Sequence, residues 1–160
     1  MKILALTVSD RASRGVYEDK TGPAAVRLLR EKFPDAEIRN PMVPDEREQI
    51  LRALEEGRDA DLILTLGGTG LGPRDVTPEA TEAFCDRKAP GIAEYLRIKS
   101  LEETPFSPLS RGTAGLHCKT LVVNMPGSVR GVEFGIKTLF PLLSHAFLMI
   151  EGGSHEKGKL

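Results

Sequence analysis

The sequence predicts an α/β protein with three layers, in which helices cover both faces of a mostly parallel central sheet. Three short apolar runs of β-forming residues support this prediction: residues 3–8, 62–66 and 120–123. None alternates strictly between apolar and polar residues, which is typical of strands buried on both faces of a parallel sheet. Helical patterns separate the runs, and strands that alternate with helices indicate a parallel sheet.

The remaining elements follow from the same patterns. A weaker β-type run, 36–43, contains Pro41, so we expect an edge strand there. Helical patterns predict helices at residues 23–33, 46–56, 78–85 and 92–101. Residues 129–150 are rich in apolar side chains but contain Pro141, so we expect two helices there or one helix kinked near Phe140. Residues 1–150 should form one domain, and residues 151–160 a polar tail.

Composition argues against several classes of protein. Charged residues make up 28% of the chain and the net charge is -1, so nothing indicates nucleic acid or an anionic membrane as a partner. The first apolar run is too short for a signal peptide, and no apolar stretch approaches the roughly 20 residues of a membrane span. We therefore expect a soluble, cytoplasmic protein. Cys85 and Cys118 have no metal-binding spacing and should be reduced thiols.

Residues 62–81, LILTLGGTGLGPRDVTPEAT, have the features of an anion site. An apolar run ends in Gly67, Gly68, Thr69 and Gly70, and Arg74 follows shortly before a helix start. Glycines let main-chain N–H groups approach an oxyanion, and a helix N-terminus adds positive charge. The segment matches neither the Walker A motif nor the GxGxxG motif. A tight strand-to-helix turn explains the glycines equally well, so both interpretations stay open here.

Two further loops follow apolar runs and should lie at the same edge of the sheet. Ligands of such sheets bind beyond the carboxyl ends of the strands, so the convergence of loops is stronger evidence than any single loop. A fourth polar loop precedes the last run and is most simply a connector. The loop after the first run contains the candidate residues Ser9 and Asp10, and the loop after the last run contains Pro126, Gly127 and Ser128. The candidates in the fourth loop are Ser110 and Arg111.

Asp45 and Asp75 each have a structural explanation. Asp45 lies where the N-cap of the 46–56 helix should be, and Glu48 stands three residues later, as in a capping box. Helix caps are far commoner than catalytic carboxylates, so local chemistry favours a cap. Asp75 would orient the turn before Thr77 caps the next helix, with Pro78 in its first position.

Together these segments resemble the MogA/MoaB family of molybdopterin adenylyltransferases, whose domain also occurs in gephyrin. The similarity extends from about residue 3 to residue 150. It rests on motifs in the family's order: SDR…G…D…GP at 9–23, PDE at 44–46, GGTG…RDVTPEA at 67–80, LSR at 109–111 and N-x-PG at 124–127.

The resemblance implies a three-layer α/β fold, a homotrimer, and transfer of AMP from ATP to molybdopterin with release of pyrophosphate. It also implies that Asp45 and Asp75 are the critical acidic residues, which reverses the local interpretation of Asp45. On this hypothesis both carboxylates hold Mg²⁺ and the ATP phosphates. The phosphate ligands would be Gly67, Gly68, Thr69, Gly70, Arg74 and Thr77.

Ser9, Asp10, Ser110, Arg111, Pro126, Gly127 and Ser128 are the candidate ligands of molybdopterin. The molybdenum insertion protein is a further candidate partner. Two competing functions remain: a trimeric molybdopterin-binding or scaffold protein without turnover, and a small-molecule kinase. The kinase is disfavoured because no residue indicates an accepting hydroxyl or its base.

Overall fold

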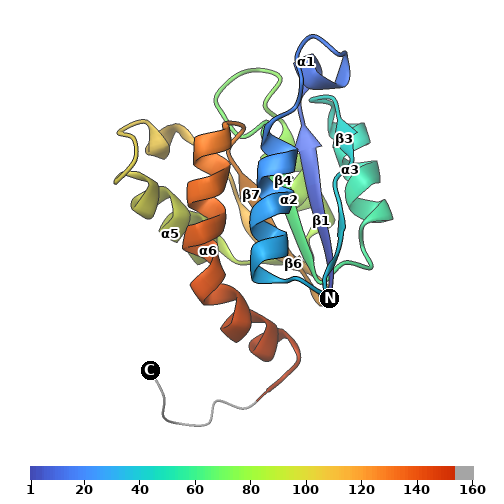
Figure 1. The fold of residues 1–160 in the computed structure, drawn as a ribbon, viewed down its shortest axis with the longest axis vertical. Coiled ribbons are helices and arrows are strands. Elements are labelled where there is room, and N and C mark those ends of the chain that lie inside the picture. Colours follow the sequence, from blue (N-terminus) through green and yellow to red (C-terminus); the bar gives the residue numbers. More distant parts are fainter. Residues whose placement is uncertain (154–160) are drawn as a thin grey trace.

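One mixed sheet lies at the centre of the computed structural model, which describes residues 1–153 (Figure 1). Its strands are β1 (Lys2–Val8), β2 (Glu37–Arg39), β3 (Met42–Val43), β4 (Leu62–Leu66), β5 (Arg87–Lys88), β6 (Ala114–His117) and β7 (Thr120–Met125). Their order is β2-β1-β4-β7-β6-β5, and β3 also pairs with β1. β1, β4 and β7 run parallel, whereas β6 is antiparallel to both β5 and β7. The predicted mostly parallel sheet is confirmed.

Helices cover both faces of this sheet, which confirms the predicted three layers. They are α1 (Asp10–Ser13), α2 (Thr21–Lys32), α3 (Arg47–Glu56), α4 (Thr77–Phe84), α5 (Pro90–Ser100) and α6 (Val129–Ile150), with a short 3₁₀ turn at Ser107–Leu109. α2, α5 and α6 pack on one face, and α3 and α4 on the other. Successive residues of β1 show this division, because Ala5 packs in the first layer of core and Leu6 in the second.

The register of the three parallel strands places the loops that follow them at one edge. Thr7 of β1 lies opposite Leu66 of β4, and Leu66 lies opposite Met125 of β7. All five residues of β4 are buried, as expected for the central strand. The glycine loop after β4 therefore starts between the loops after β1 and β7.

Several predicted elements need adjustment. The run 36–43 forms two strands, because the chain breaks near Pro41, whose carbonyl accepts a hydrogen bond from the N–H of Thr7 at 3.0 Å. Residues 129–150 form one helix, which contains Pro141 and is bent in its C-terminal half (Figure 1). Of the two predicted alternatives, a single kinked helix is therefore confirmed. The short elements α1, β5 and β6 were not predicted. β5 and β6 are held by strand pairing, and α1 has only four residues, too few to show a helical period.

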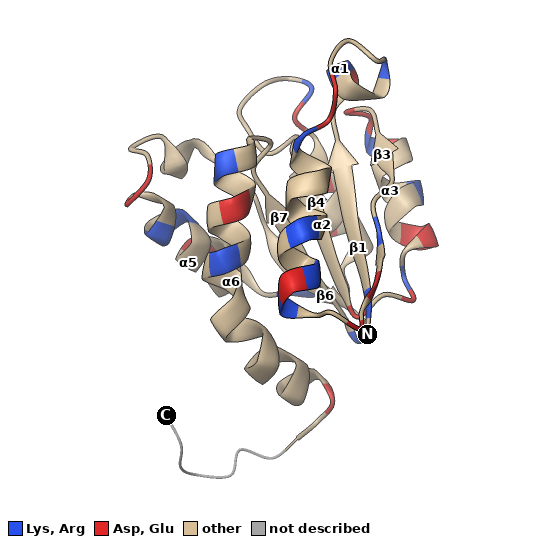
Figure 2. Cartoon of the chain, viewed as in Figure 1, with Lys and Arg blue, Asp and Glu red and all other residues tan. Residues whose placement is uncertain are grey.

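From the sequence we expected no apolar stretch as long as a membrane span, and α6 contradicts this expectation. Among the helices of residues 1–153, it alone has the length and apolar composition of a membrane span. No charged residue follows Lys137 within it (Figure 2). Its buried side chains, which include Val132, Ile136 and Leu139, pack in the core against the sheet, and 22% of its most apolar window is buried within the described residues.

Two smaller expectations concern the tail and the thiols. From residue 154 on, the predicted polar tail lies outside the described residues. Cys85 and Cys118 are both free, as predicted. Burial raises the pKa of the Cys85 thiol to about 11, so this side chain stays a neutral thiol near pH 7.

Candidate functional site

The three loops beyond β1, β4 and β7 meet at one place. The N–H of Gly67 donates to the carbonyl of Met125 at 3.1 Å. A Cβ atom on Gly127 would lie 3.3 Å from the Cα of Gly67, so the two glycine loops pack directly on each other. The hydroxyl of Thr21, at the start of α2, donates to the carbonyl of Gly127 at 3.3 Å. The convergence inferred from the sequence is therefore present.

Gly67 and Gly68 form a cradle in which a side chain at either position would be strained. Their φ angles are +110° and +63°, values at which a side chain is strained. A Cβ on Gly67 would collide with the carbonyl oxygen of Val8. A Cβ on Gly68 would overlap the Thr77 hydroxyl and lie 2.8 Å from Asp45 Oδ1.

The main-chain donors that follow Gly67 are available to a ligand. Within residues 1–153, no hydrogen-bond acceptor serves the N–H groups of Gly68, Thr69 and Gly70. Consecutive main-chain donors of this kind form concave anion sites. The structure thus supports the anion cradle over a turn that only connects strand and helix.

Asp45 does not cap α3, so this prediction is wrong. The helix begins at Arg47, and its N-cap residue, Glu46, makes no side-chain capping bond. Instead, Asp45 Oδ2 accepts a hydrogen bond from the N–H of Asp10 at 2.7 Å. Burial is the main cause that raises the pKa of Asp45, and the negative charges of Asp10 and Asp75 raise it further.

Asp75 and Thr77 open α4 in an unexpected way. Asp75 Oδ2 accepts the N–H of Gly72 at 2.9 Å, so Asp75 orients the turn as predicted. Thr77 is already the first helical residue, after Val76 as N-cap, so the predicted cap at Thr77 is wrong. Thr77 is 0% exposed, and its Oγ1 is the one buried side-chain N or O atom of residues 1–153 without a hydrogen-bond partner.

A magnesium ion fits this set of donors. Asp45 Oδ1 and the orphaned Thr77 hydroxyl both face the position that a Cβ of Gly68 would fill, and Mg²⁺ prefers carboxylate and other hard oxygen ligands. Within residues 1–153 no group of three or more His, Cys, Asp and Glu residues is placed to hold a metal ion. A bound ion would therefore take its other ligands from phosphate and water, as Mg²⁺ usually does.

Asp10 holds Arg74 in a two-pronged ion pair. Arg74 Nε donates to Asp10 Oδ2 and Nη2 to Oδ1, both at 2.9 Å. The guanidinium group lowers the pKa of Asp10. Since the Arg74 side chain is 54% exposed, it remains accessible to a ligand at the edge of the site. Ser9 caps α1 by accepting the N–H of Ala12 at 3.2 Å.

A cavity of about 450 Å³ lies between α5, the 3₁₀ turn and the N-terminal end of α6. Three of the predicted molybdopterin ligands line it: Ser110, Pro126 and Ser128. Ser9, Asp10, Arg111 and Gly127 are not among its lining residues. The sequence analysis missed the lining residues Arg97, Glu103, Phe106, Asn124, Arg130 and Phe134. Five of these six missed residues lie in no motif, because this part of the cavity forms only when α5 packs beside α6; only Asn124, in the N-x-PG motif, carried a signal.

Asn124 fixes the wall between the cavity and the sheet. Its Nδ2 donates to the hydroxyls of Thr65 and Thr81, both at 2.8 Å, and its Oδ1 accepts the N–H of Thr113 at 3.0 Å. Asn124 is 5% exposed, and buried polar networks with every partner satisfied hold a single arrangement. The loop that carries Ser110 is thereby tied to β4, α4 and β7.

Comparison with known proteins identifies the family of this chain. A family model described as a probable molybdopterin binding domain matches residues 4–145. The chain belongs to this family. It is 39% identical over 151 residues to the molybdopterin adenylyltransferase of Helicobacter pylori (strain ATCC 700392 / 26695), which covers 92% of this chain and 86% of the relative.

Solved structures of this family share the fold. The molybdopterin biosynthesis enzyme MoaB from Thermus thermophilus superposes with a TM-score of 0.86 at 42% identity, over 94% of this chain and 96% of that chain. The molybdopterin biosynthesis Mog protein from Mycobacterium ulcerans gives a TM-score of 0.86 at 38% identity, over 93% and 98% of the two chains.

Proposed function

We propose that this protein is a molybdopterin adenylyltransferase, which transfers AMP from ATP to molybdopterin in molybdenum cofactor biosynthesis. The observation that supports this most is the pairing of two sites at one edge of the sheet. A glycine cradle between two carboxylates adjoins a cavity of about 450 Å³, in a chain 39% identical to an enzyme of that name.

The cradle is the proposed site for the ATP phosphates. The N–H groups of Gly68, Thr69 and Gly70 donate to phosphate oxygens, and Arg74 adds a positive charge at the exposed side. Asp45 and Asp75 would hold Mg²⁺. Asp45 Oδ1 and the Thr77 hydroxyl lie on the same side of Gly68, and Asp75 Oδ2 lies beside Gly70. When bound, the ion supplies positive charge that offsets the repulsion between the two anionic substrates.

The cavity is the proposed site for the pterin. Phe106 and Phe134 offer apolar ring surfaces, while Ser110, Ser128 and Arg97 offer polar groups at its wall. Ligand pockets in proteins commonly have volumes of roughly 300–1,000 Å³ and a few placed polar groups. Ser110 of the cavity wall is followed in the chain by Arg111, which contacts Gly70 of the cradle.

The reaction needs alignment rather than a covalent protein intermediate. A phosphate oxygen of molybdopterin attacks the α-phosphorus of ATP, a new P–O bond forms, and the bond from the α-phosphorus to the bridging oxygen of pyrophosphate breaks. The leaving pyrophosphate takes the bonding electron pair. The chain's own residues hold the two anionic substrates in line and offset the repulsion between their negative charges.

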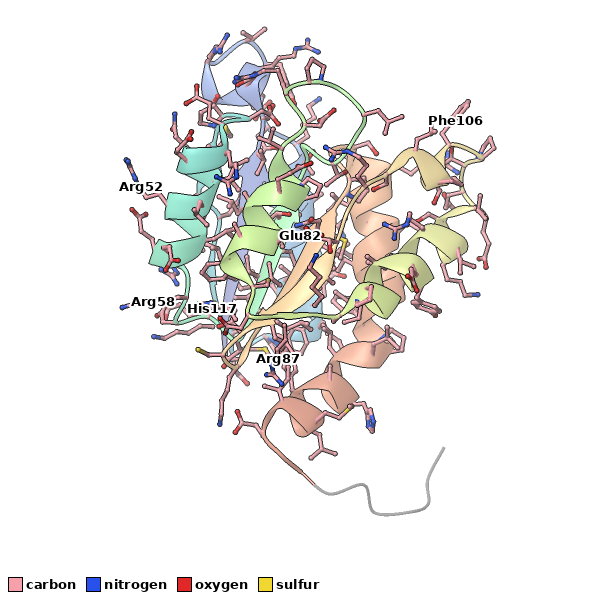
Figure 3. All side chains as sticks on the ribbon, turned by 180° about the vertical axis from the view of Figure 1, so that it is seen from behind. Arg52, Arg58, Glu82, Arg87, Phe106 and His117 are labelled. Carbon is pink, nitrogen blue, oxygen red and sulfur yellow. The ribbon has the colours of Figure 1, made fainter. Side chains whose placement is uncertain are left out.

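The proposed assembly is a homotrimer that acts in the cytoplasm. An apolar area on α5 and the turn after it, which we call the α5 surface, supports an association between copies. It consists of Tyr95, Ile98, Leu101, Phe106 and Leu109, whose exposed fractions range from 36% to 71%. Phe106 extends outward from the molecule at this edge (Figure 3), and exposed apolar patches commonly mark interfaces.

The experiment that tests the function measures the products formed from ATP and molybdopterin. The proposed enzyme releases pyrophosphate only when molybdopterin and Mg²⁺ are both present. Molybdopterin binding without pyrophosphate release would indicate a binding or scaffold protein instead. Release of ADP would indicate a kinase.

A further inference from the structure

One side chain from a distant loop holds both ends of the segment that carries Asp75. Arg111 Nε donates to the carbonyl of Gly70 at 2.8 Å, and its Nη2 donates to the carbonyl of Asp75. The N–H of Arg111 also donates to the carbonyl of Thr69 at 2.8 Å. We call residues 70–75 the Asp75 loop. Arg111 therefore bridges two carbonyls that are five positions apart in it.

Besides Arg111, one side chain attaches the exposed part of the Asp75 loop to the body within residues 1–153, namely Arg74. Residues 71–74 are exposed, and Leu71 at their start is 67% exposed, so no apolar side chain anchors the tip. Inside the loop, Asp75 and Gly72 exchange two hydrogen bonds, at 3.0 Å and 2.9 Å. These bonds shape the turn but do not attach it to the body. Arg74 reaches across to Asp10, and the base is closed by the N–H of Thr77, which donates to Gly68.

Glu79 orients the guanidinium group for this task. Arg111 Nη1 donates to Glu79, in the first turn of α4. The Arg111 side chain is 36% exposed and that of Glu79 47%, so the ion pair by itself contributes little stability. Its consequence is geometric, because a planar guanidinium fixed by one carboxylate directs its other N–H groups along set lines.

We infer that Arg111 is a positioning residue that sets the place of the Asp75 carboxylate, rather than a ligand of molybdopterin. This inference rests on the proposed function for the role of Asp75. Three sides of the guanidinium group already face Gly70, Asp75 and Glu79. The residue also does not line the cavity. Its action on the reaction therefore passes through Asp75.

The test replaces Arg111 by lysine, which keeps the positive charge but cannot donate to the carbonyls of Gly70 and Asp75 in the geometry of the planar guanidinium group. Loss of a residue that orients a metal ligand typically weakens metal binding 10–100-fold, so Arg111→Lys should raise the half-saturating Mg²⁺ concentration at least about tenfold. The KM for molybdopterin should stay within about twofold, since the cavity is untouched. A raised KM for molybdopterin with unchanged Mg²⁺ dependence would overturn the inference.

Amide hydrogen exchange gives a readout that does not need turnover. In Arg111→Lys the hydrogen-bonded amides of Gly72 and Asp75 should exchange faster, while those of the core strand β4 keep their protection. Glu79→Gln should have a smaller effect, because the two carbonyl contacts of Arg111 remain. Unchanged exchange in the loop, or an equal effect of Glu79→Gln, would contradict the inference that Arg111 fixes the loop through the carbonyls of Gly70 and Asp75.

Arg27→Lys is the matched control. Arg27 pairs with Glu31 and Glu133 on the outer surface of α2 and α6, so its replacement should change neither readout. If no variant, wild type included, releases pyrophosphate, the proposed function fails. The exchange experiment then still decides whether Arg111 fixes the Asp75 loop.

Discussion

Asp10 and Asp45 exchange hydrogen bonds across 35 residues of sequence. The N–H of Asp10 donates to Asp45 Oδ2 at 2.7 Å, and the N–H of Asp45 donates to Asp10 Oδ1 at 3.2 Å. Arg74 then clamps the other side of Asp10 with two bonds of 2.9 Å. The loops after β1, β3 and β4 are thus joined through one carboxylate, and Asp45 is held where the glycine cradle begins.

This arrangement predicts that Asp45→Asn raises stability while it removes activity. The folded pKa of Asp45 lies above its ordinary value of 3.8, mainly because of burial. Ionised Asp45 therefore destabilises the folded state at neutral pH, and this cost disappears below the unfolded pKa. Asparagine is uncharged and still accepts the N–H of Asp10. We expect the Tm without metal at pH 7 to rise, and the gain to vanish near pH 3.

Calorimetry and pyrophosphate release together check this prediction. Adenylyl transfer by Asp45→Asn should fall by roughly 100-fold or more, as expected when a ligand of the reacting phosphates is lost. A lower Tm at pH 7 would show that the carboxylate is structural. Normal transfer by both Asp45→Asn and Asp75→Asn would remove these residues from the mechanism.

The cradle predicts different consequences for alanine at two glycines that have similar left-handed φ angles. Gly15 and Gly68 have φ angles of +68° and +63°, but a Cβ on Gly15 meets nothing within 4 Å. Both alanine variants should lose about 1–2 kcal/mol to the left-handed backbone. Only Gly68→Ala should also lose nucleotide binding, because its Cβ would fill the space between Thr77 and Asp45. Titration calorimetry with Mg·ATP measures this, and equal affinities of the two variants would contradict a cradle at Gly68.

The unpartnered hydroxyl of Thr77 predicts that its removal weakens nucleotide binding without lowering the stability of the fold. A buried hydroxyl without a partner costs about 1–3 kcal/mol, and the Thr77 hydroxyl has none in residues 1–153. Thr77→Val should therefore unfold at the same or a higher temperature than wild type. If the hydroxyl serves the nucleotide or its metal, the Kd for Mg·ATP should rise about tenfold, the equivalent of one hydrogen bond. Thr77→Ser is the control and should bind as wild type does; an unchanged Kd for Thr77→Val would leave the hydroxyl without a role in binding.

The proposed homotrimer predicts a different effect for two exposed apolar residues. Ile98 is 66% exposed in the α5 surface, and Leu148 is 49% exposed near the end of α6. A charge buried in an apolar interface opposes association, so Ile98→Glu should give monomers in light-scattering measurements. Leu148→Glu should remain a trimer. A trimeric Ile98→Glu variant would exclude the α5 surface as the interface.

The parts of the fold that were predicted correctly depend on local sequence. Residues 62–66 were predicted as a buried strand because four of the five are Leu or Ile and no residue is charged, and β4 has those same bounds. The antiparallel edge was not predicted, because β6 is held by pairing with β7 and carries Gly115 in its middle. A glycine there favours a connector on propensity alone, and only the tertiary pairing overrides it.

The residues of the glycine cradle could be proposed from the sequence, but most residues that line the cavity and the contacts within the site could not. The glycine, aspartate and arginine positions of residues 67–75 stand out in the sequence, because few structural roles need that combination. The sequence also suggested that Asp45 caps α3, whereas the carboxylate turns to the N–H of Asp10. That choice depends on the packing of α1 above β3. The position of Arg111 against Gly70 and Asp75 likewise appears only once the loops are folded together.

The most direct measurement is a crystal structure with Mn²⁺ and a non-hydrolysable ATP analogue, which locates the metal by its anomalous signal. The account predicts a metal within about 2.5 Å of carboxylate oxygens of both Asp45 and Asp75, with the nucleotide phosphates on the N–H groups of Gly68, Thr69 and Gly70. A metal and triphosphate bound away from both carboxylates would contradict it.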